Sequence, residues 1–245
     1  MSIDHQHNII EVKNVSFSYG KEIVLENINL NIHKGDYLGI IGPNGGGKTT
    51  LLKIILRLLT PSSGTVHLFG QDICYFNKWS KIGYVPQKAT NFDANFPLTV
   101  EEIVAMGQYG KDYHQDIINE SLKQVEMFDL RKKIIGDLSG GQQQRVFIAK
   151  ALAGEPEIIF LDEPTVGVDV KTQEQFYKIL KKLNQKLKIT LILISHDIDV
   201  IASETTEIAC VNKNLIYDNN PKNFLRSEKL KRLYGGGVRF IFHTH

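Results

Sequence analysis

The sequence predicts an α/β protein in which helices connect the strands of a mainly parallel sheet. Tyr37–Ile41 is a nearly continuous apolar run, which is typical of a central strand buried on both faces, and a glycine-rich turn and a helical segment follow it. From Glu157 onward, short apolar segments alternate with a longer helical one. This alternation indicates parallel strands joined by crossover helices.

The first part of the chain is expected to form short strands. Ile9–Tyr19 mixes apolar with polar residues, and Ile28, Leu30 and Ile32 alternate with polar neighbours, as in a strand with one buried face. After the buried strand, apolar residues recur at helical spacing and predict a helix that Pro61–Gly64 ends. The apolar residues are Leu51, Leu52, Ile54, Ile55, Leu58 and Leu59.

The middle of the chain is expected to be more helical. Thr99 and Glu102 have the spacing of a capping box, which opens a helix. Further helices are predicted at Asp116–Met127, Gln142–Ala153 and Lys171–Lys186, and strands at Ile158–Leu161 and Thr190–Ser195. The sequence therefore predicts an α/β core with a helical region inserted near residues 88–150.

The composition is that of an ordinary globular protein. Of the 245 residues, 42% are hydrophobic and 23% are charged, which excludes a disordered, collagen-like or disulfide-scaffold protein. Lys and Arg total 29 against 27 Asp and Glu, so the chain lacks the basic footprint that nucleic acid would require. Cys74 and Cys210 are too few for a disulfide framework and favour a reducing compartment.

The predicted location follows from the hydropathy of the segments. No stretch approaches the roughly 20 nearly uncharged residues that a membrane-spanning helix needs. Met1–Asn8 is polar and lacks the apolar core of a signal peptide. We therefore expect a cytoplasmic protein, any membrane role of which depends on a partner.

A phosphate-binding loop is predicted directly after the buried strand. The chain matches the pattern of such loops at every fixed position, with Gly42-Pro43-Asn44-Gly45-Gly46-Gly47-Lys48-Thr49. The next residue, Thr50, is also predicted to bind the nucleotide. The glycines let backbone N–H groups approach phosphate oxygens, and the next helix adds the positive end of its dipole. Lys48 is expected to contact the β- and γ-phosphates, and the Thr49 hydroxyl is expected to bind Mg²⁺.

A second motif supplies two carboxylates at the end of a predicted strand. The segment Ile158–Leu161 leads into Asp162 and Glu163. Asp162 lies where a Mg²⁺ shell needs a negative group, and Glu163 is placed to polarise the water that attacks the γ-phosphate. A strand that ends in solvated acidic residues is common, so this pattern alone does not indicate a nucleotide site. It does so only in combination with the phosphate-binding loop.

A third motif identifies the family. The helix Gln142–Ala153 is preceded by Leu138-Ser139-Gly140-Gly141-Gln142, and a lone Ser-Gly-Gly would indicate only an N-cap turn. With the two motifs above, however, the chain resembles the ATP-binding subunit of an ABC transporter, whose signature motif is this pentapeptide. The resemblance covers roughly Ile9 to Leu233, with the motifs in the family's order and spacing.

The resemblance implies a fold and further site residues. The fold is that of a P-loop NTPase of the ABC ATPase type: a parallel sheet core, an antiparallel β subdomain and an inserted helical subdomain, in one domain over residues 1–245. Tyr19 matches the aromatic residue that stacks on adenine; the alternative is an aromatic residue of a strand that packs in the core. Gln87 matches the glutamine that contacts Mg²⁺ and the attacking water. Asp169 matches the loop that crosses to the second subunit. His196 matches the switch histidine on the γ-phosphate, although a lone histidine is more often structural.

The resemblance also implies partners. Family members act as head-to-tail pairs, so that Ser139 and Gly141 of one chain face the γ-phosphate held by the other. The cargo passes through a separate integral membrane permease subunit. An extracytoplasmic metal-binding protein delivers the cargo to that permease. The chain itself is expected at the cytoplasmic face of the membrane, as a homodimer, without nucleic acid.

The expected docking site for the permease lies near residues 88–106. It includes Phe92, Phe96 and Pro97, which are equally well explained as packing within the helical region. His243 and His245 at one end of the chain, with His5 and His7 at the other, form a weaker candidate for metal binding.

The cargo is predicted from segments beside the motifs. Gly46, the segment Gly83–Lys88 and the segment Asn95–Val100 resemble the ATPases of zinc, manganese or iron importers. The predicted function is therefore ATP hydrolysis that powers import of a divalent metal ion. The alternatives are an iron-chelate or cobalamin importer, an exporter, an inactive regulatory subunit, and an ABC ATPase that acts on DNA or ribosomes.

Overall fold

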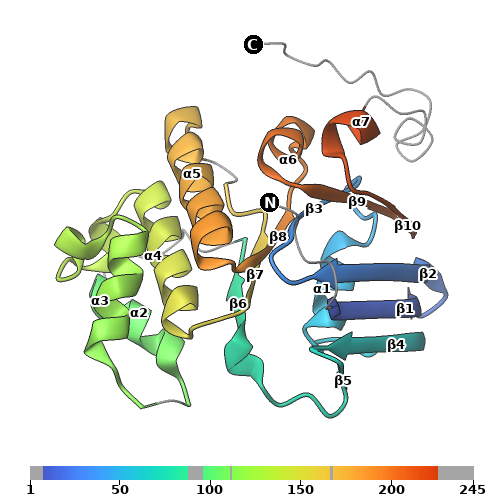
Figure 1. Cartoon of the computed structure of the whole chain (residues 1–245), viewed down its shortest axis with the longest axis horizontal. Helices are drawn as coiled ribbons and strands as arrows, with labels where there is room; N and C mark the ends of the chain where they lie inside the picture. Colours follow the sequence, from blue (N-terminus) through green and yellow to red (C-terminus); the bar gives the residue numbers. More distant parts are fainter. Residues whose placement is uncertain (1–7, 88–95, 111, 166–167, 226–245) are drawn as a thin grey trace. The chain divides into compact units, whose positions relative to one another are not determined.

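The computed structural model describes residues 8–87, 96–110, 112–165 and 168–225 (Figure 1). The chain divides into two compact units. The first consists of residues 1–77 and 192–245, and the second of residues 78–191. Each unit is described by itself.

An antiparallel sheet forms one part of the first unit. Its strands are β1 (Asn8–Tyr19), β2 (Glu22–His33), β4 (Ser63–Leu68) and β5 (Gln71–Asp72), in the order β2-β1-β4-β5. Ile28, Leu30 and Ile32 are buried opposite residues of β1, which confirms the alternation predicted for β2. The antiparallel β subdomain implied by the family resemblance is therefore present.

Parallel strands form the other part of the first unit. They are β3 (Tyr37–Ile41) and β9 (Glu207–Asn212), and β10 (Asn214–Asp218) pairs antiparallel with β9. All five residues of β3 are buried, as the apolar run predicted. The helices of this unit are α1 (Lys48–Ile55), α6 (Ile198–Glu204) and α7 (Pro221–Leu225).

Helix α1 ends earlier than its apolar spacing predicted. The Arg57 backbone is left-handed at φ 56°, and the Arg57 N–H donates to Ile54 O at 3.0 Å. The Leu58 N–H donates to Lys53 O at 2.7 Å. These two bonds form a Schellman motif, which ends the helix at Ile55, six residues before Pro61. Leu58 is consequently 65% exposed.

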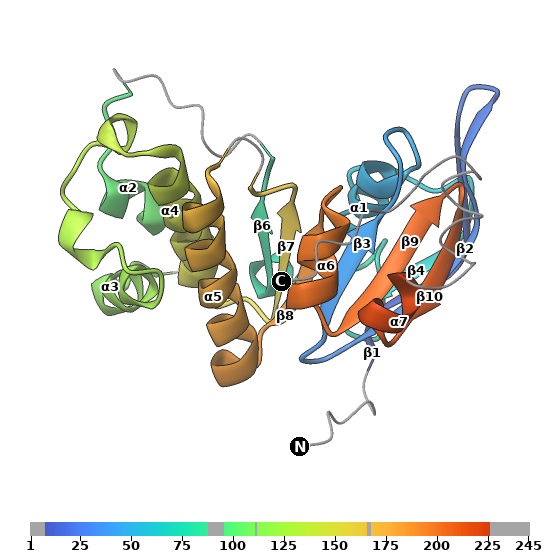
Figure 2. The ribbon, with the colours of Figure 1, turned by 90° about the horizontal axis from the view of Figure 1, so that it is seen from above.

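The second unit holds the remaining strands and helices. Strand β6 (Ile82–Val85) pairs in parallel with β7 (Ile158–Asp162), and β8 (Thr190–Ile194), in which the division between the units falls, lies on the other side of β7. The helices between β6 and β7 are α2 (Val100–Ala105), α3 (Gln115–Gln124) and α4 (Gly140–Ala153). They pack on one another (Figure 2). Helix α5 (Val170–Leu187) connects β7 to β8, as a crossover between parallel strands requires.

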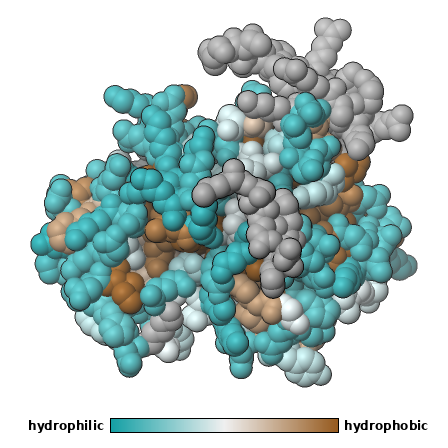
Figure 3. Space-filling model, in the orientation of Figure 1, coloured by the Kyte–Doolittle hydropathy of each residue, from teal (hydrophilic) through white to brown (hydrophobic). Residues whose placement is uncertain are grey.

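The capping box predicted before α2 is present. The Thr99 hydroxyl accepts from the Glu102 N–H, and the Glu102 carboxylate accepts from the Thr99 N–H at 2.7 Å. Helix α3 ends at Gln124, three residues before the predicted end, and α4 begins two residues before its predicted start. Within the described part of the chain, every helix is too short or too polar to cross a membrane. The face drawn in Figure 3 is mostly hydrophilic.

Candidate functional site

The phosphate loop lies between β3 and α1, within the first unit. A Cβ at Gly42 would lie 2.0 Å from Val211 O on β9, so no side chain fits there. Gly47 has φ 102°, a left-handed conformation that glycine adopts without strain. The loop backbone is thus pressed against β9 on one side, which leaves Asn44 and Gly45 exposed on the other.

Lys48 folds its side chain back into this loop. The ammonium donates hydrogen bonds to Gly42 O at 2.9 Å and to Pro43 O at 3.1 Å, and the residue is only 6% exposed. Such a buried cation, at the first residue of a helix, makes the loop a site for an anion. Thr49 points outward and is exposed, whereas Thr50 is buried.

Tyr19 lies at the end of β1, also in the first unit. Its ring contacts the ring of Phe17 edge to face, with centroids 4.8 Å apart, and Tyr19 is 51% exposed. Because half of its surface is open to solvent, Tyr19 is not the core aromatic that the sequence left as an alternative. The neighbouring strand β2 carries Leu25, against which Gly47 packs.

His196 follows β8 in the first unit. The preceding residue, Ser195, donates its N–H to Ile40 O at 3.2 Å, and Ile40 lies two residues before the phosphate loop. Asp197 accepts from the Val200 N–H at 3.2 Å and so caps α6. The exposed His196 is thereby fixed at the edge where β3 ends, which is where ligands collect in open α/β sheets.

The second unit brings Gln87 and Glu163 into direct contact. The Gln87 side-chain amide donates to a Glu163 carboxylate oxygen at 3.0 Å. Both residues follow paired strands, because Val85 of β6 lies opposite Leu161 of β7. Glu163 also has a left-handed backbone at φ 46°, an uncommon conformation for a glutamate and one found at functional turns.

Asp162 is the last residue of β7 and is 6% exposed. Tyr84, on the adjacent strand, faces Phe160 in the register. Burial raises the pKa of the Tyr84 hydroxyl, and the nearby Asp162 carboxylate raises it further. Tyr84 therefore stays protonated beside Asp162, a relationship that the sequence analysis did not find.

The loop after Glu163 is held by residues that the sequence analysis missed. The buried Gln144 of α4 donates its side-chain amide to Pro164 O. Gln173 of α5 donates to Thr165 O at 3.2 Å and to Val168 O at 3.0 Å. In the sequence these residues are visible only as glutamines near the starts of predicted helices. The backbone oxygens that they bind lie 5 to 20 residues away in the chain, so the pattern does not indicate them.

Asp169 caps helix α5. Its carboxylate accepts from the Thr172 N–H at 3.0 Å, and hydrogen bonds from Thr172 hold the pKa of Asp169 below its ordinary value. The side chain is exposed. The predicted dimer-loop residue is thus also a helix cap in this chain.

The predicted signature motif forms the start of helix α4. Ser139 and Gln142 form a second capping box, in which the Ser139 N–H donates to the Gln142 side chain at 3.0 Å. Ser139 and Gly140 are exposed, whereas Leu138 and Gly141 are buried. A Cβ at Gly141 would lie 2.0 Å from Thr172 Cγ2, so Gly141 permits close packing of α4 against α5.

Each unit thus gathers its own share of the predicted residues. The first unit holds Tyr19, the phosphate loop Gly42–Thr50 and His196. The second holds Gln87, Asp162, Glu163, Leu138–Gln142 and Asp169. Phe96 and Pro97 are exposed, whereas Phe92 and the four terminal histidines lie outside the described residues.

Comparison with known proteins decides the family. Residues 25–166 match the model of the ABC transporter family. The chain belongs to this family. As an ABC ATPase it binds and hydrolyses ATP, and the phosphate loop with Lys48 is the part of the molecule that suits the nucleotide.

Individual ABC proteins are similar over most of their length. The zinc uptake system ATP-binding protein ZurA of Listeria innocua is 45% identical, over 89% of this chain and 88% of that protein. The manganese transport system ATP-binding protein MntB of Bacillus subtilis is 37% identical, over 95% of this chain and 94% of that protein. A bacterial ABC transporter cassette with a solved dimeric structure is 34% identical at a TM-score of 0.73, covering 86% of this chain and 98% of that cassette.

Proposed function

We propose that this chain is the ATP-hydrolysing subunit of an importer for a divalent metal ion: zinc, manganese or iron. The observation that carries the proposal is the 45% identity to a zinc uptake ATP-binding protein over nearly the full length of both chains. The similarity to a manganese transport protein supports the same class of cargo. The phosphate loop and the exposed start of the signature helix supply the chemistry for it.

The phosphates are held by the first unit. Lys48 is already buried in the loop as a cation, and on ATP binding it exchanges carbonyl contacts for oxygens of the β- and γ-phosphates. The N-terminus of α1 adds the positive end of its dipole. Tyr19 offers an exposed ring for stacking on adenine, and His196 contacts the γ-phosphate.

The residues present also fit Mg²⁺. Thr49 has an exposed hydroxyl, Asp162 ends a buried strand with a carboxylate, and Gln87 has an amide oxygen, and Mg²⁺ prefers oxygen ligands. When bound, the ion neutralises charge on the β- and γ-phosphates. Glu163 orients the attacking water and accepts its proton, while the hydrogen bond from Gln87 fixes the glutamate side chain.

Two chains act together in this proposal. Of the two residues predicted to face the partner's γ-phosphate, Ser139 is exposed and Gly141 is buried. Ser139 and Gly140 are exposed at the start of a 14-residue helix, which makes them suited to an anion presented by another chain. A head-to-tail homodimer places them on the γ-phosphate bound by the partner, with Asp169 at the interface. The dimeric structure of a similar cassette supports pairing of two chains. ATP then holds the pair together, and loss of the γ-phosphate releases it.

The remaining partners lie in or beyond the membrane. A permease subunit carries the ion, an extracytoplasmic metal-binding protein delivers it, and this chain lies at the cytoplasmic face. The exposed Phe96 and Pro97 are the described residues of the predicted docking groove. In this proposal residues 1–245 act as one ABC domain, with the helical region of about residues 88–150 contacting the permease.

Growth under metal limitation tests the proposed cargo. Cells whose only copy carries Glu163→Gln are expected to stop growing in a medium depleted of divalent metals, and to recover when zinc, manganese or iron salts are added. Glu174→Gln is the matched control, because Glu174 is an exposed glutamate of α5 in the same unit. Normal growth of the Glu163→Gln cells would overturn the proposal. Recovery only with an iron chelate or cobalamin would favour those alternatives instead.

A further inference from the structure

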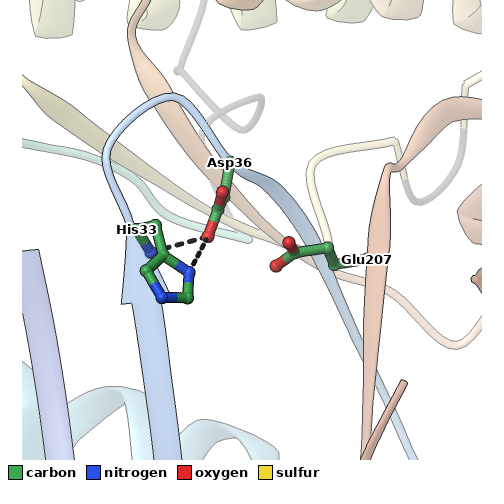
Figure 4. Close-up of side chains that lie close together, drawn as sticks. All are labelled: His33, Asp36 and Glu207. Carbon is green, nitrogen blue, oxygen red and sulfur yellow. Dashed lines mark hydrogen bonds and ion pairs between the residues drawn. The ribbon is translucent and has the colours of Figure 1, made fainter. Parts of the chain in front are cut away.

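Three metal-ligating side chains meet at the edge of the first unit that lies opposite the phosphate loop. His33 ends β2, Asp36 directly precedes β3, and Glu207 begins β9. One potential ligand atom from each lies within 4.8 Å of the others. Figure 4 shows the Glu207 carboxylate pointing toward His33 and Asp36. Among the residues that the structure describes, no other group of His, Cys, Asp and Glu has this spacing.

The fold holds these side chains in place. The Asp36 carboxylate accepts the His33 backbone N–H at 2.6 Å, and the Asp36 N–H donates to His33 O at 3.2 Å, which closes a tight turn. Glu207 joins them because β9 pairs with β3 such that Glu207 lies opposite Leu38. The cluster is therefore assembled by strand pairing and a turn, rather than by mobile side chains at a surface.

The electrostatics of the cluster favour a cation. Asp36 is 0% exposed and Glu207 is 5% exposed, so two carboxylates lie close together away from water. Burial of neighbouring like charges is costly unless a positive group compensates them. A divalent cation at the point where the three ligand atoms meet would supply positive charge beside both carboxylates.

We propose that His33, Asp36 and Glu207 form a second metal site, which binds Zn²⁺ outside the nucleotide site. One imidazole nitrogen and two carboxylate oxygens suit Zn²⁺ better than Mg²⁺ or Ca²⁺, which prefer oxygen ligands alone. The His33 Nδ1 atom lies 3.3 Å from Asp36 Oδ2. Ligands of tetrahedral zinc, at about 2.1 Å from the ion, are roughly 3.4 Å apart, so these two atoms already have the required spacing.

Tyr217 supplies a supporting hydrogen bond around the cluster. The Tyr217 side chain forms a hydrogen bond with the Glu207 carboxylate. A hydrogen bond of this kind, made behind a metal ligand, fixes the orientation of that ligand. The His33 side chain is 21% exposed, so the cluster is open to solvent at this residue. The ligand set alone carries this site, so it stands whether or not the chain serves metal import.

Calorimetric titration of the full-length chain with ZnCl₂ tests the site. Excess MgCl₂ and the absence of nucleotide keep zinc from the phosphate loop. All proteins carry four background changes that remove the terminal histidines: His5→Asn, His7→Asn, His243→Asn and His245→Asn. One zinc per chain is expected, and Glu207→Gln or His33→Asn should weaken its binding at least 10-fold. The exposed His114 of the other unit provides the control His114→Asn, which should bind zinc like the parent.

X-ray absorption at the zinc edge of the parent protein adds a readout that does not depend on variants. A shell of mixed nitrogen and oxygen with one imidazole is expected, without sulfur from Cys74. The proposal is overturned if the parent binds no zinc below about 100 μM, if the two variants bind like the parent, or if the shell contains sulfur or several imidazoles. Circular dichroism of each variant separates loss of a ligand from loss of the fold, and if a variant is unfolded the absorption spectrum decides.

Discussion

The Gln87 side-chain amide donates a hydrogen bond of 3.0 Å to the Glu163 carboxylate, although 76 residues separate the two in the chain. The bond joins the ends of β6 and β7, two paired parallel strands. It fixes the side chain that is proposed to orient the attacking water. Gln87 also precedes, in the chain, the helices α2, α3 and α4 of the same unit.

Loss of the Glu163 carboxylate should separate ATP binding from hydrolysis. Glu163→Gln is nearly isosteric and keeps the hydrogen-bonding capacity toward Gln87, but it removes the group that accepts the proton of water. Hydrolysis should fall by about 100-fold or more, because one transition-state group is lost. Affinity for ATP should stay within about threefold of the parent. Equal turnover by the variant and by Glu174→Gln would exclude this role.

Removal of the Gln87 amide should act through Glu163. Gln87→Leu keeps the approximate volume but deletes the donor, and we expect hydrolysis to fall about 10-fold as Glu163 loses its orientation. In a Glu163→Gln background the same change should have a smaller effect, because only the loss of the proposed Mg²⁺ ligand remains. Single-turnover rates of the four proteins measure the coupling. Additive effects would show that Gln87 acts independently of Glu163.

The packing of Gly141 can be tested by a paired substitution. In Gly141→Ala the new Cβ would lie 2.0 Å from Thr172 Cγ2, so one of the two groups must move. Overpacking of this kind costs about 1–3 kcal/mol of unfolding free energy. Thr172→Ser removes that methyl group, so the double variant should recover most of the loss. Urea denaturation of the four proteins checks this, and no recovery would place the strain elsewhere.

Stability at high pH should depend on Cys210. Burial raises the pKa of its thiol from 9.0 to about 12, although the charge of Lys48 opposes this shift. Above pH 9 the unfolded chain therefore loses this proton first, and the free energy of unfolding falls by up to about 1.4 kcal/mol per pH unit from this group. The stabilisation is present below pH 9 and decreases as the pH rises.

The comparison for Cys210 uses a Cys74→Ala background, which removes the exposed thiol. In this background the unfolding free energy is measured between pH 8 and 10.5, with and without Cys210→Ala. The variant is expected to be less stable at pH 8 because of the cavity, but to have a shallower decline with pH. Parallel declines in the two proteins would contradict the prediction.

Local patterns in the sequence predicted the fold well. The buried run Tyr37–Ile41, the alternation in β2 and the capping box at Thr99 each depend on neighbours within a few residues, and each is present. The end of α1 was missed because the apolar spacing continues through Leu58 and Leu59, whereas the left-handed backbone of Arg57 ends the helix. Arg57 has no sequence signal for that conformation, which glycine usually supplies.

Contacts between segments that are distant in the chain could not be predicted from the sequence. The motifs located Glu163 and Gln87, but the bond between Gln144 and Pro164 and the contact of Gly141 with Thr172 depend on how helices pack. The same is true of His33, Asp36 and Glu207, which come together only when β9 pairs with β3. The sequence instead favours the terminal histidines as metal ligands, because His243 and His245 are separated by one residue, as are His5 and His7.

The most direct test of the central claim is the initial rate of zinc and manganese uptake by cells. Three strains are compared, in which the only copy of the chain is the parent, Glu163→Gln or the control Glu174→Gln. Uptake of iron is measured in the same samples, so that all three ions are compared. The account predicts that Glu163→Gln abolishes uptake of at least one of these ions while Glu174→Gln leaves it at the parental rate. Unchanged uptake of all three ions in the Glu163→Gln cells would contradict metal import powered by this chain.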